Sequence, residues 1–106
     1  MRVITGTARG RVLRTLEGED VRPTTDRVKE AVFSIIQFEI EGRRVLDLFA
    51  GSGQLGIEAL SRGAASATFV DMSKDSLSAV KYNLEHTKLG DNAKVVQTDA
   101  LSFLKL

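Results

Sequence analysis

The feature that most constrains the fold is a short apolar run that leads directly into a glycine-rich turn. Residues 45–49, Val-Leu-Asp-Leu-Phe, form a nearly continuous apolar segment, as is typical of a strand buried on both faces of a parallel sheet. Residues 51–56, Gly-Ser-Gly-Gln-Leu-Gly, match the pattern G-x-G-x-x-G, and apolar positions between 55 and 60 predict a helix that Gly63 ends. A strand, a glycine turn and a helix in this order indicate a nucleotide-type cofactor site on an α/β fold.

The chain after this turn continues to alternate between predicted strands and helices. Residues 67–71 predict a second strand, and residues 74–88 predict a helix with one apolar face. Residues 95–96 mark the centre of a third strand, and residues 99–106 begin another helix. Strands that alternate with helices form βαβ units, so we predict a Rossmann-like parallel sheet.

Two more elements are predicted before the glycine turn. Apolar runs on either side of a segment bounded by Gly6 and Gly10 predict a β-hairpin with a longer loop. After Pro23, a stripe of apolar residues from Val28 to Ile36 predicts an amphipathic helix. We therefore expect a basic hairpin and loop over residues 1–22 and a partial cofactor-binding domain over residues 23–106.

Basic residues are distributed unevenly along the chain. Residues 1–16 contain four arginines and no acidic residue, whereas residues 45–106 contain six lysines or arginines and seven acidic residues. The four arginines are Arg2, Arg9, Arg11 and Arg14. A basic front end on a nearly neutral body favours contact with a polyanion. The alternative is that these arginines only solvate an exposed hairpin.

Composition excludes several classes of protein and site. No run of about 18 apolar residues occurs, which excludes a transmembrane helix. The absence of cysteine excludes disulfides and thiolate metal sites, and it is compatible with the reducing cytoplasm, where we place the protein. The one histidine, His86, has no second histidine or cysteine as a partner, so we expect no metal site.

Three acidic residues stand at or near the ends of the three successive strands. These are Asp47, Asp71 and Asp99, and the carboxyl ends of parallel strands meet at the edge of the sheet where ligands bind. Asp47 precedes Gly51 by four residues, and its charge repels a pyrophosphate but attracts a cation. S-adenosylmethionine carries a sulfonium and an ammonium group and no phosphate, so the sequence favours it as the cofactor.

Each carboxylate also has a competing interpretation. Asp71 follows Gly51 by 20 residues, where dinucleotide-binding proteins place the acid that binds ribose, so an NAD-dependent oxidoreductase remains an alternative. Asp99 can accept a hydrogen bond from an adenine amine while the Ala100 amide supports a ring nitrogen. Alternatively, Asp47 is a buried acid bonded to loop amides, and Asp71 and Asp99 are helix caps.

Two segments resemble a known family of enzymes. Residues 45–53 resemble motif I of class I S-adenosylmethionine-dependent methyltransferases. Residues 22–33, Arg-Pro-Thr-Thr-Asp-Arg-Val-Lys-Glu-Ala-Val-Phe, resemble the segment before motif I in the bacterial 16S rRNA (guanine-N2)-methyltransferase family, which also opens with a basic hairpin. The resemblance runs the full length of the chain.

The resemblance implies a cofactor site and an RNA-binding surface. The implied cofactor-binding residues are Asp47, Phe49, Gly51, Ser52, Gly53, Asp71, Met72, Asp99 and Ala100. The implied RNA-binding residues are Arg2, Arg9, Arg11, Arg14 and Arg22, with Thr24 near the cofactor or the target base. The implied partner is 16S rRNA or the small ribosomal subunit, and the implied reaction is methyl transfer to the exocyclic N2 of a guanine.

The chain departs from this family in one respect. The family carries an Asp or Asn, two prolines and an aromatic residue after its fourth strand, whereas this sequence contains a single proline, Pro23. We therefore expect a truncated enzyme with negligible activity alone, and a first strand at an open sheet edge that a partner or a second copy covers. A non-catalytic cofactor- or RNA-binding fragment is the remaining alternative.

Overall fold

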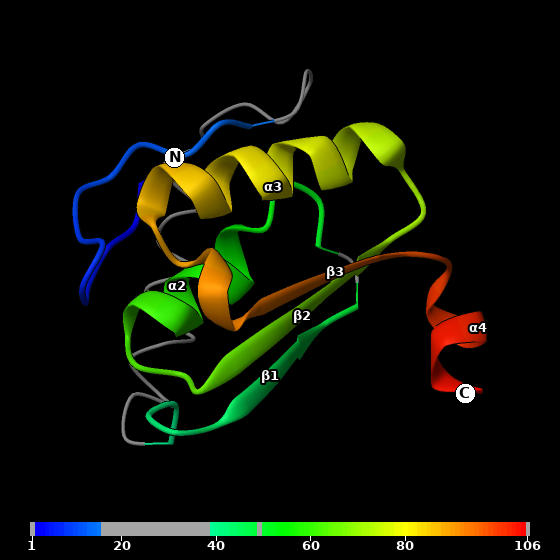
Figure 1. The fold of residues 1–106 in the computed structure, drawn as a ribbon, viewed down its shortest axis with the longest axis horizontal. Coiled ribbons are helices and arrows are strands. Elements are labelled where there is room, and N and C mark those ends of the chain that lie inside the picture. The colour runs from blue at the N-terminus through cyan, green and yellow to red at the C-terminus, as the bar shows by residue number, and fades with distance from the viewer. Residues whose placement is uncertain (1, 16–38, 49, 106) are drawn as a thin grey trace.

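The computed structural model describes residues 2–15, 39–48 and 50–105. Its centre is a three-stranded parallel sheet, and helices connect the successive strands (Figure 1). Strand β1 spans Arg44–Asp47, β2 spans Ser66–Asp71 and β3 spans Ala93–Gln97, in the sheet order β1-β2-β3. The predicted α/β, Rossmann-like arrangement is therefore confirmed for the described residues.

The helices connect the strands as expected. Helix α2 (Gln54–Ser61) follows β1 and helix α3 (Lys74–Thr87) follows β2, and both lie on the same side of the sheet (Figure 1). A 3-10 turn (Gly90–Asn92) precedes β3, and a short helix, α4 (Ala100–Leu104), follows it. The third glycine of the turn permits close packing of α2 on the sheet, because a Cβ at Gly56 would lie 2.3 Å from Cε2 of Phe69 in β2.

The prediction that the first strand is buried on both faces was wrong for the described residues. Leu46 in β1 is 44% exposed, and Val45 beside it is half-buried. The reason is that α2 and α3 cover one face of the sheet only (Figure 1). Among the described strands β1 pairs with β2 alone, so it lies at an edge of the sheet, as expected from the sequence.

The predicted hairpin is present as a turn without regular strands. A single antiparallel bridge joins Arg2 to Val12, and the Val3 amide donates to the Arg11 carbonyl at 3.0 Å. The side chains of Val3, Ala8 and Leu13 are buried in the same hydrophobic core as those of the helices and β2. Residues 2–15, the basic segment, therefore pack as part of the domain core.

The helix ends use local hydrogen bonds that the sequence indicated only in part. Ser73 caps α3, because its hydroxyl accepts a hydrogen bond from the Ser76 amide at 3.2 Å. The far end closes at Lys88, which takes the left-handed conformation with φ 60° that glycine usually supplies. The predicted helix after Pro23 and the predicted site residues Arg22, Thr24 and Phe49 lie outside the described residues.

Candidate functional site

A pocket of about 200 Å³ lies at the carboxyl ends of the strands. Its lining residues are Leu48, Asp71, Met72, Thr98, Asp99 and Ala100. Four of the predicted cofactor residues therefore meet in this strand-end pocket, at the edge where parallel sheets bind their ligands. The volume is below the roughly 300–1,000 Å³ of a pocket for a drug-sized molecule, so it suits one part of a larger cofactor.

Asp71 joins the end of β2 to the glycine loop, residues 50–53. One oxygen of its carboxylate accepts the Gly51 amide at 3.0 Å, and the other accepts the Ser73 amide at 2.8 Å. The 20-residue spacing from Gly51 to Asp71 thus corresponds to a direct contact. Ser73 serves as the cap of α3, and the half-buried Asp71 carboxylate keeps lone pairs for a further donor such as a ribose hydroxyl.

Asp99 caps the short helix α4, as the alternative interpretation of this residue anticipated. Its carboxylate accepts the Ser102 amide at 2.8 Å and the Ser102 hydroxyl at 2.7 Å. The hydrogen bond from the Ser102 amide is the main reason that the pKa of the Asp99 carboxyl lies below its ordinary value, and the bond from the Ser102 hydroxyl adds to this effect. The charged group lies beside Ala100 at the wall of the pocket.

The glycine loop bends through two left-handed residues. Gly51 has φ 56° and Gly53 has φ 84°, and a Cβ at Gly53 would lie 3.1 Å from Cγ2 of Val80 in α3. The Gly53 amide donates to the Ala50 carbonyl at 2.8 Å, so this amide and that of Gly51 are both engaged within the protein. A loop that cradles a pyrophosphate points such amides at the ligand instead.

Two other predicted residues, Asp47 and Ser52, do not line this pocket. Ser52 is 1% exposed, so its side chain lies in the interior, where its hydroxyl has no hydrogen-bond partner among the described residues. Asp47 ends β1 opposite Phe69 and is half-buried, and it is not one of the residues that line the strand-end pocket. The structure therefore brings Asp71, Met72, Asp99 and Ala100 together in one pocket, and Asp47 and Ser52 are not among its lining residues.

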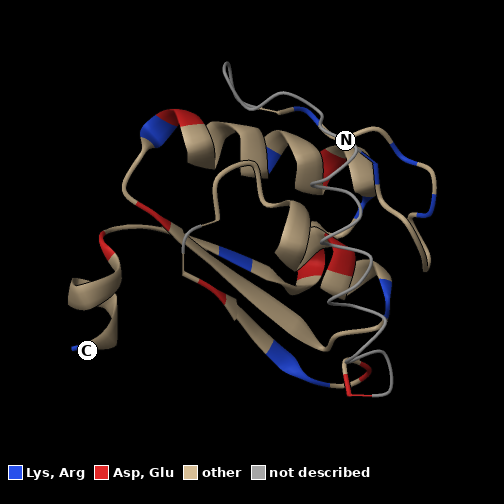
Figure 2. Ribbon diagram, turned by 180° about the vertical axis from the view of Figure 1, so that it is seen from behind, with Lys and Arg blue, Asp and Glu red and all other residues tan. Residues whose placement is uncertain are grey.

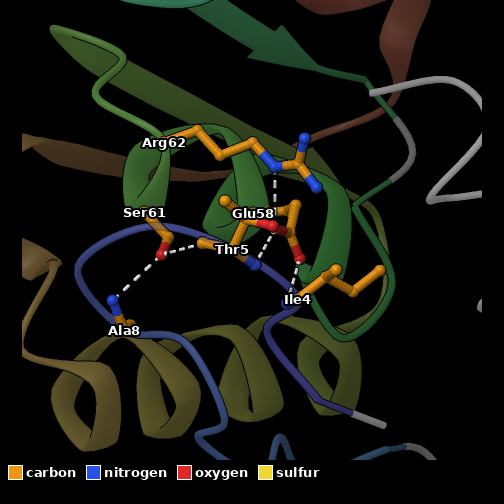
Figure 3. Close-up of polar contacts among 6 residues, drawn as sticks. All are labelled: Ile4, Thr5, Ala8, Glu58, Ser61 and Arg62. Carbon is orange, nitrogen blue, oxygen red and sulfur yellow. Dashed lines mark hydrogen bonds and ion pairs between the residues drawn. The ribbon is translucent and has the colours of Figure 1, made fainter. Parts of the chain in front are cut away.

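Buried side chains of α2 hold the basic segment in place. Glu58 is fully buried, and its carboxylate accepts the amides of Ile4 at 2.8 Å and Thr5 at 3.0 Å and the Arg62 guanidinium Nε at 2.9 Å. Ser61 donates its hydroxyl to the Thr5 carbonyl and accepts the Ala8 amide. Figure 3 shows these contacts between the segment and one face of the helix.

Glu58, Ser61 and Asn83 were not among the residues singled out from the sequence. Asn83 of α3 is fully buried and bonds to the backbone of Arg14 and to the backbone of Ser52. A polar residue on the otherwise apolar face of a predicted helix was the available signal, because buried polar groups must find partners.

The basic segment presents its arginines to solvent beside α3. Arg2, Arg9, Arg11 and Arg14 are all exposed, and Figure 2 shows the basic positions along the segment next to this helix. The Arg14 guanidinium lies 4.4 Å from the ring centroid of Tyr82, which stacks on His86 at 5.9 Å. The helical i, i+4 spacing of Tyr82 and His86 was the sequence signal for this stack.

The described residues contain no helix long and apolar enough to cross a membrane. Within the same residues, no group of three or more histidine, cysteine, aspartate or glutamate side chains is arranged to hold a metal ion.

Comparison with known proteins identifies close relatives. A family model described as "Conserved hypothetical protein 95" matches residues 1–106. The chain is 50% identical over 100 residues to YlbH of Bacillus subtilis, covering 94% of this chain and 54% of that protein. It is 46% identical over 104 residues to "Ribosomal RNA small subunit methyltransferase D" of Escherichia coli K12, covering 98% of this chain and 52% of that protein.

A solved structure supports the same relationship. The yhhF protein of Escherichia coli superposes with a TM-score of 0.87 at 46% identity, covering 98% of this chain and 56% of that one. The chain spans about half the length of the relatives it matches. These matches confirm the predicted resemblance and the Rossmann-like methyltransferase fold.

Proposed function

The chain belongs to the family described as Conserved hypothetical protein 95, and on this premise we propose that it is the cofactor-binding part of an S-adenosylmethionine-dependent methyltransferase. The acceptor we propose is the exocyclic N2 of a guanine in 16S rRNA. The small-subunit rRNA methyltransferase name of the Escherichia coli relative supports an rRNA substrate. The guanine specificity comes only from the family resemblance of residues 22–33 and of the basic hairpin.

The choice of cofactor rests on the hydrogen bonds that the backbone amides of the glycine loop make within the protein. The Gly51 amide donates to the Asp71 carboxylate and the Gly53 amide donates to the Ala50 carbonyl. A pyrophosphate would have to displace these bonds and approach the Asp71 and Asp99 carboxylates, which repel it. A cofactor with a sulfonium and an ammonium group and no phosphate meets neither obstacle.

The residues present fit such a cofactor, and each has a proposed role. Asp71 accepts the ribose hydroxyls, while Asp99 and the Ala100 amide face the adenine beside Met72. Asp47, Gly51 and Gly53 line the methionine end, and Phe49 and Ser52 are the remaining proposed cofactor-binding residues. The cofactor supplies a methyl group that its sulfonium activates for transfer. What these residues contribute is orientation of that methyl toward the acceptor.

The RNA is held on the basic segment in this proposal. Arg2, Arg9, Arg11 and Arg14 are exposed and, with Arg22, bind phosphates of 16S rRNA or of the small subunit in the cytoplasm. The sequence contains no Asp or Asn followed by two prolines and an aromatic residue. We therefore propose that residues 1–106 bind cofactor and RNA but do not themselves methylate RNA.

The test is calorimetric titration of the chain with S-adenosylhomocysteine and, in parallel, with NADH. We expect binding of the first only, and loss of that binding in Asp71→Ala. Asp75→Ala is the matched control, because Asp75 is an exposed acid on the first turn of α3 and does not line the pocket. Binding of NADH would support the oxidoreductase alternative, and an undiminished affinity in Asp71→Ala would remove the proposed ribose site.

Self-association is a separate part of the proposal. The outer edge of β1 has no partner strand among the described residues, and an exposed Leu46 lies on this strand. An open strand edge pairs readily with another chain. Sedimentation at increasing protein concentration tests this, and a monomer at every concentration would exclude pairing of two copies through β1.

A further inference from the structure

Asn83 joins two regions that the proposed function treats as separate sites. Its Oδ1 accepts the Arg14 amide at 2.7 Å, and its Nδ2 donates to the Arg14 carbonyl at 2.9 Å and to the Ser52 carbonyl at 2.9 Å. Arg14 belongs to the basic segment, and Ser52 lies at the centre of the glycine loop. A single buried carboxamide on α3 therefore holds the backbone of both.

Only an asparagine-like group satisfies these three contacts. The backbone amide of Arg14 requires an acceptor, whereas the two carbonyls require donors, so just one orientation of the carboxamide fits. An aspartate would supply no donor, and a leucine of similar shape would supply nothing. Because Asn83 is 0% exposed, water cannot replace a lost partner without entering the core.

The contacts of Asn83 continue into the strand-end pocket. Ser52 follows Gly51, whose amide donates to the Asp71 carboxylate on the pocket wall. On the other side of Asn83, the backbone of Arg14 is held by the carboxamide, and the Arg14 guanidinium lies 4.4 Å from the centroid of the Tyr82 ring. A contiguous series of hydrogen bonds and covalent bonds thus connects a pocket carboxylate to an exposed arginine of the basic segment.

The second attachment of the basic segment does not reach the cofactor loop. Glu58 and Ser61 bind residues 4, 5 and 8 from α2, and among the described residues the side-chain hydrogen bonds of Ser61 go to Thr5 and Ala8 rather than to the glycine loop. The two attachments therefore differ in what they connect, although both are buried polar contacts to the same segment.

We propose that Asn83 is a positioning residue that couples cofactor binding to RNA binding. A cofactor that fixes Asp71 and the glycine loop also fixes the Ser52 carbonyl, and through Asn83 it fixes the backbone that presents Arg14. RNA that binds Arg14 favours the same arrangement of the loop, because a coupling between two equilibria is reciprocal. This inference rests on the proposed function for the identity of its two ligands.

The first experiment measures the coupling directly. The probe is a fluorescein-labelled RNA hairpin of about 20 nucleotides, and its affinity is measured by anisotropy with and without saturating S-adenosylhomocysteine. We expect about fivefold tighter RNA binding with the cofactor product, the lower end of typical allosteric coupling. In Asn83→Ala we expect equal RNA affinity in both conditions.

Ser61→Ala is the matched control, because it also removes a buried anchor of the basic segment. It should lower stability and keep the fivefold coupling, since its contacts end at Thr5 and Ala8. Equal coupling in Asn83→Ala and the wild-type chain would overturn the proposal. Loss of coupling in both variants would overturn it too, because general loosening of the segment would then explain the effect.

A second measurement needs neither a variant nor the cofactor. Amide NMR spectra of the wild-type chain are recorded during titration with the RNA hairpin alone. We expect shifts at Gly51, Gly53 and Arg14 that saturate together, and no shift at Asp91, which lies in the 3-10 turn beyond α3. Failure to bind S-adenosylhomocysteine would reject the proposed function while leaving this test intact. RNA titration without shifts in the glycine loop would reject the coupling itself.

Discussion

The basic segment and the strand-end pocket use polar side chains in opposite ways. Glu58, Ser61 and Asn83 are buried and direct their oxygen and nitrogen atoms to the backbone of a segment without regular strands. Asp71 and Asp99 lie half-buried at the strand ends and bond to nearby loop and helix amides. A segment with few backbone–backbone hydrogen bonds is thus held in one conformation by buried side chains. The carboxylates of the pocket, in contrast, remain accessible to a ligand.

The largest expected effect is the removal of the interior anchor at Glu58. In Glu58→Ala the amides of Ile4 and Thr5 and the Arg62 guanidinium lose an acceptor inside the protein. We expect the free energy of unfolding to fall by about 3 kcal/mol or more, because buried donors are left unsatisfied. Urea denaturation followed by circular dichroism measures this change.

Two variants sharpen that measurement. Glu58→Gln keeps one acceptor oxygen and should lose less stability than the alanine variant. Glu85→Ala removes an exposed carboxylate of α3 and should change stability by less than about 0.5 kcal/mol. A loss below about 1 kcal/mol in Glu58→Ala would show that the basic segment does not depend on this anchor.

The next effect concerns the pocket. Asp71→Asn keeps one acceptor oxygen, so one of the two hydrogen bonds that the backbone amides of Gly51 and Ser73 donate to this side chain is weakened. We expect stability to fall by about 1 kcal/mol and affinity for S-adenosylhomocysteine to fall about tenfold, which corresponds to about 1.4 kcal/mol. Calorimetry and urea denaturation on the same protein give both values. A large loss of stability with unchanged affinity would make Asp71 an interior anchor like Glu58.

A smaller effect is expected at the outer face of the basic segment. Arg9→Ala combined with Arg11→Ala removes two exposed charges from a backbone whose contacts to α2 remain. The slope of log affinity for RNA against log salt should decrease by about 2, one for each phosphate contact. Stability should change by less than about 0.5 kcal/mol, measured in parallel. An unchanged salt slope would remove these two arginines from the RNA surface.

The smallest effect is the pH dependence of the Asp99 cap. Because hydrogen bonds from Ser102 lower the folded pKa of Asp99, the cap stabilises the folded state above the unfolded pKa of about 3.9. That stabilisation is lost as the pH falls through the lower folded pKa. The protection factors of the Ser102 and Phe103 amides, which compare their exchange with that of an unstructured peptide at the same pH, should fall with acidification in the wild-type chain. In Asp99→Asn, whose side chain does not titrate, this fall in the protection factors should be absent.

The order of the elements and the acids at the strand ends could be predicted from the sequence. Continuous apolar residues before a glycine turn, alternation of strand and helix, and acids after each strand are local patterns, and local patterns can be recognised along the chain. They predicted α2, β2, α3 and β3 and the meeting of Asp71 with Asp99, whereas Asp47, which was expected in the same crevice, does not line the pocket. They also allowed two interpretations for each acid, since a cap and a ligand contact use the same side chain.

The tertiary structure was needed to show which backbone groups Asp71 and Asp99 contact, and which distant residues meet. Asn83 contacts Arg14 across 69 positions and Ser52 across 31, and Glu58 contacts Ile4 across 54. Their positions on apolar helix faces mark them as buried polar residues but do not say which backbone they contact, because such a side chain is satisfied by whatever backbone the packing brings to it. The exposed face of β1 was likewise decided by which side of the sheet the helices cover, a property of the assembled layers.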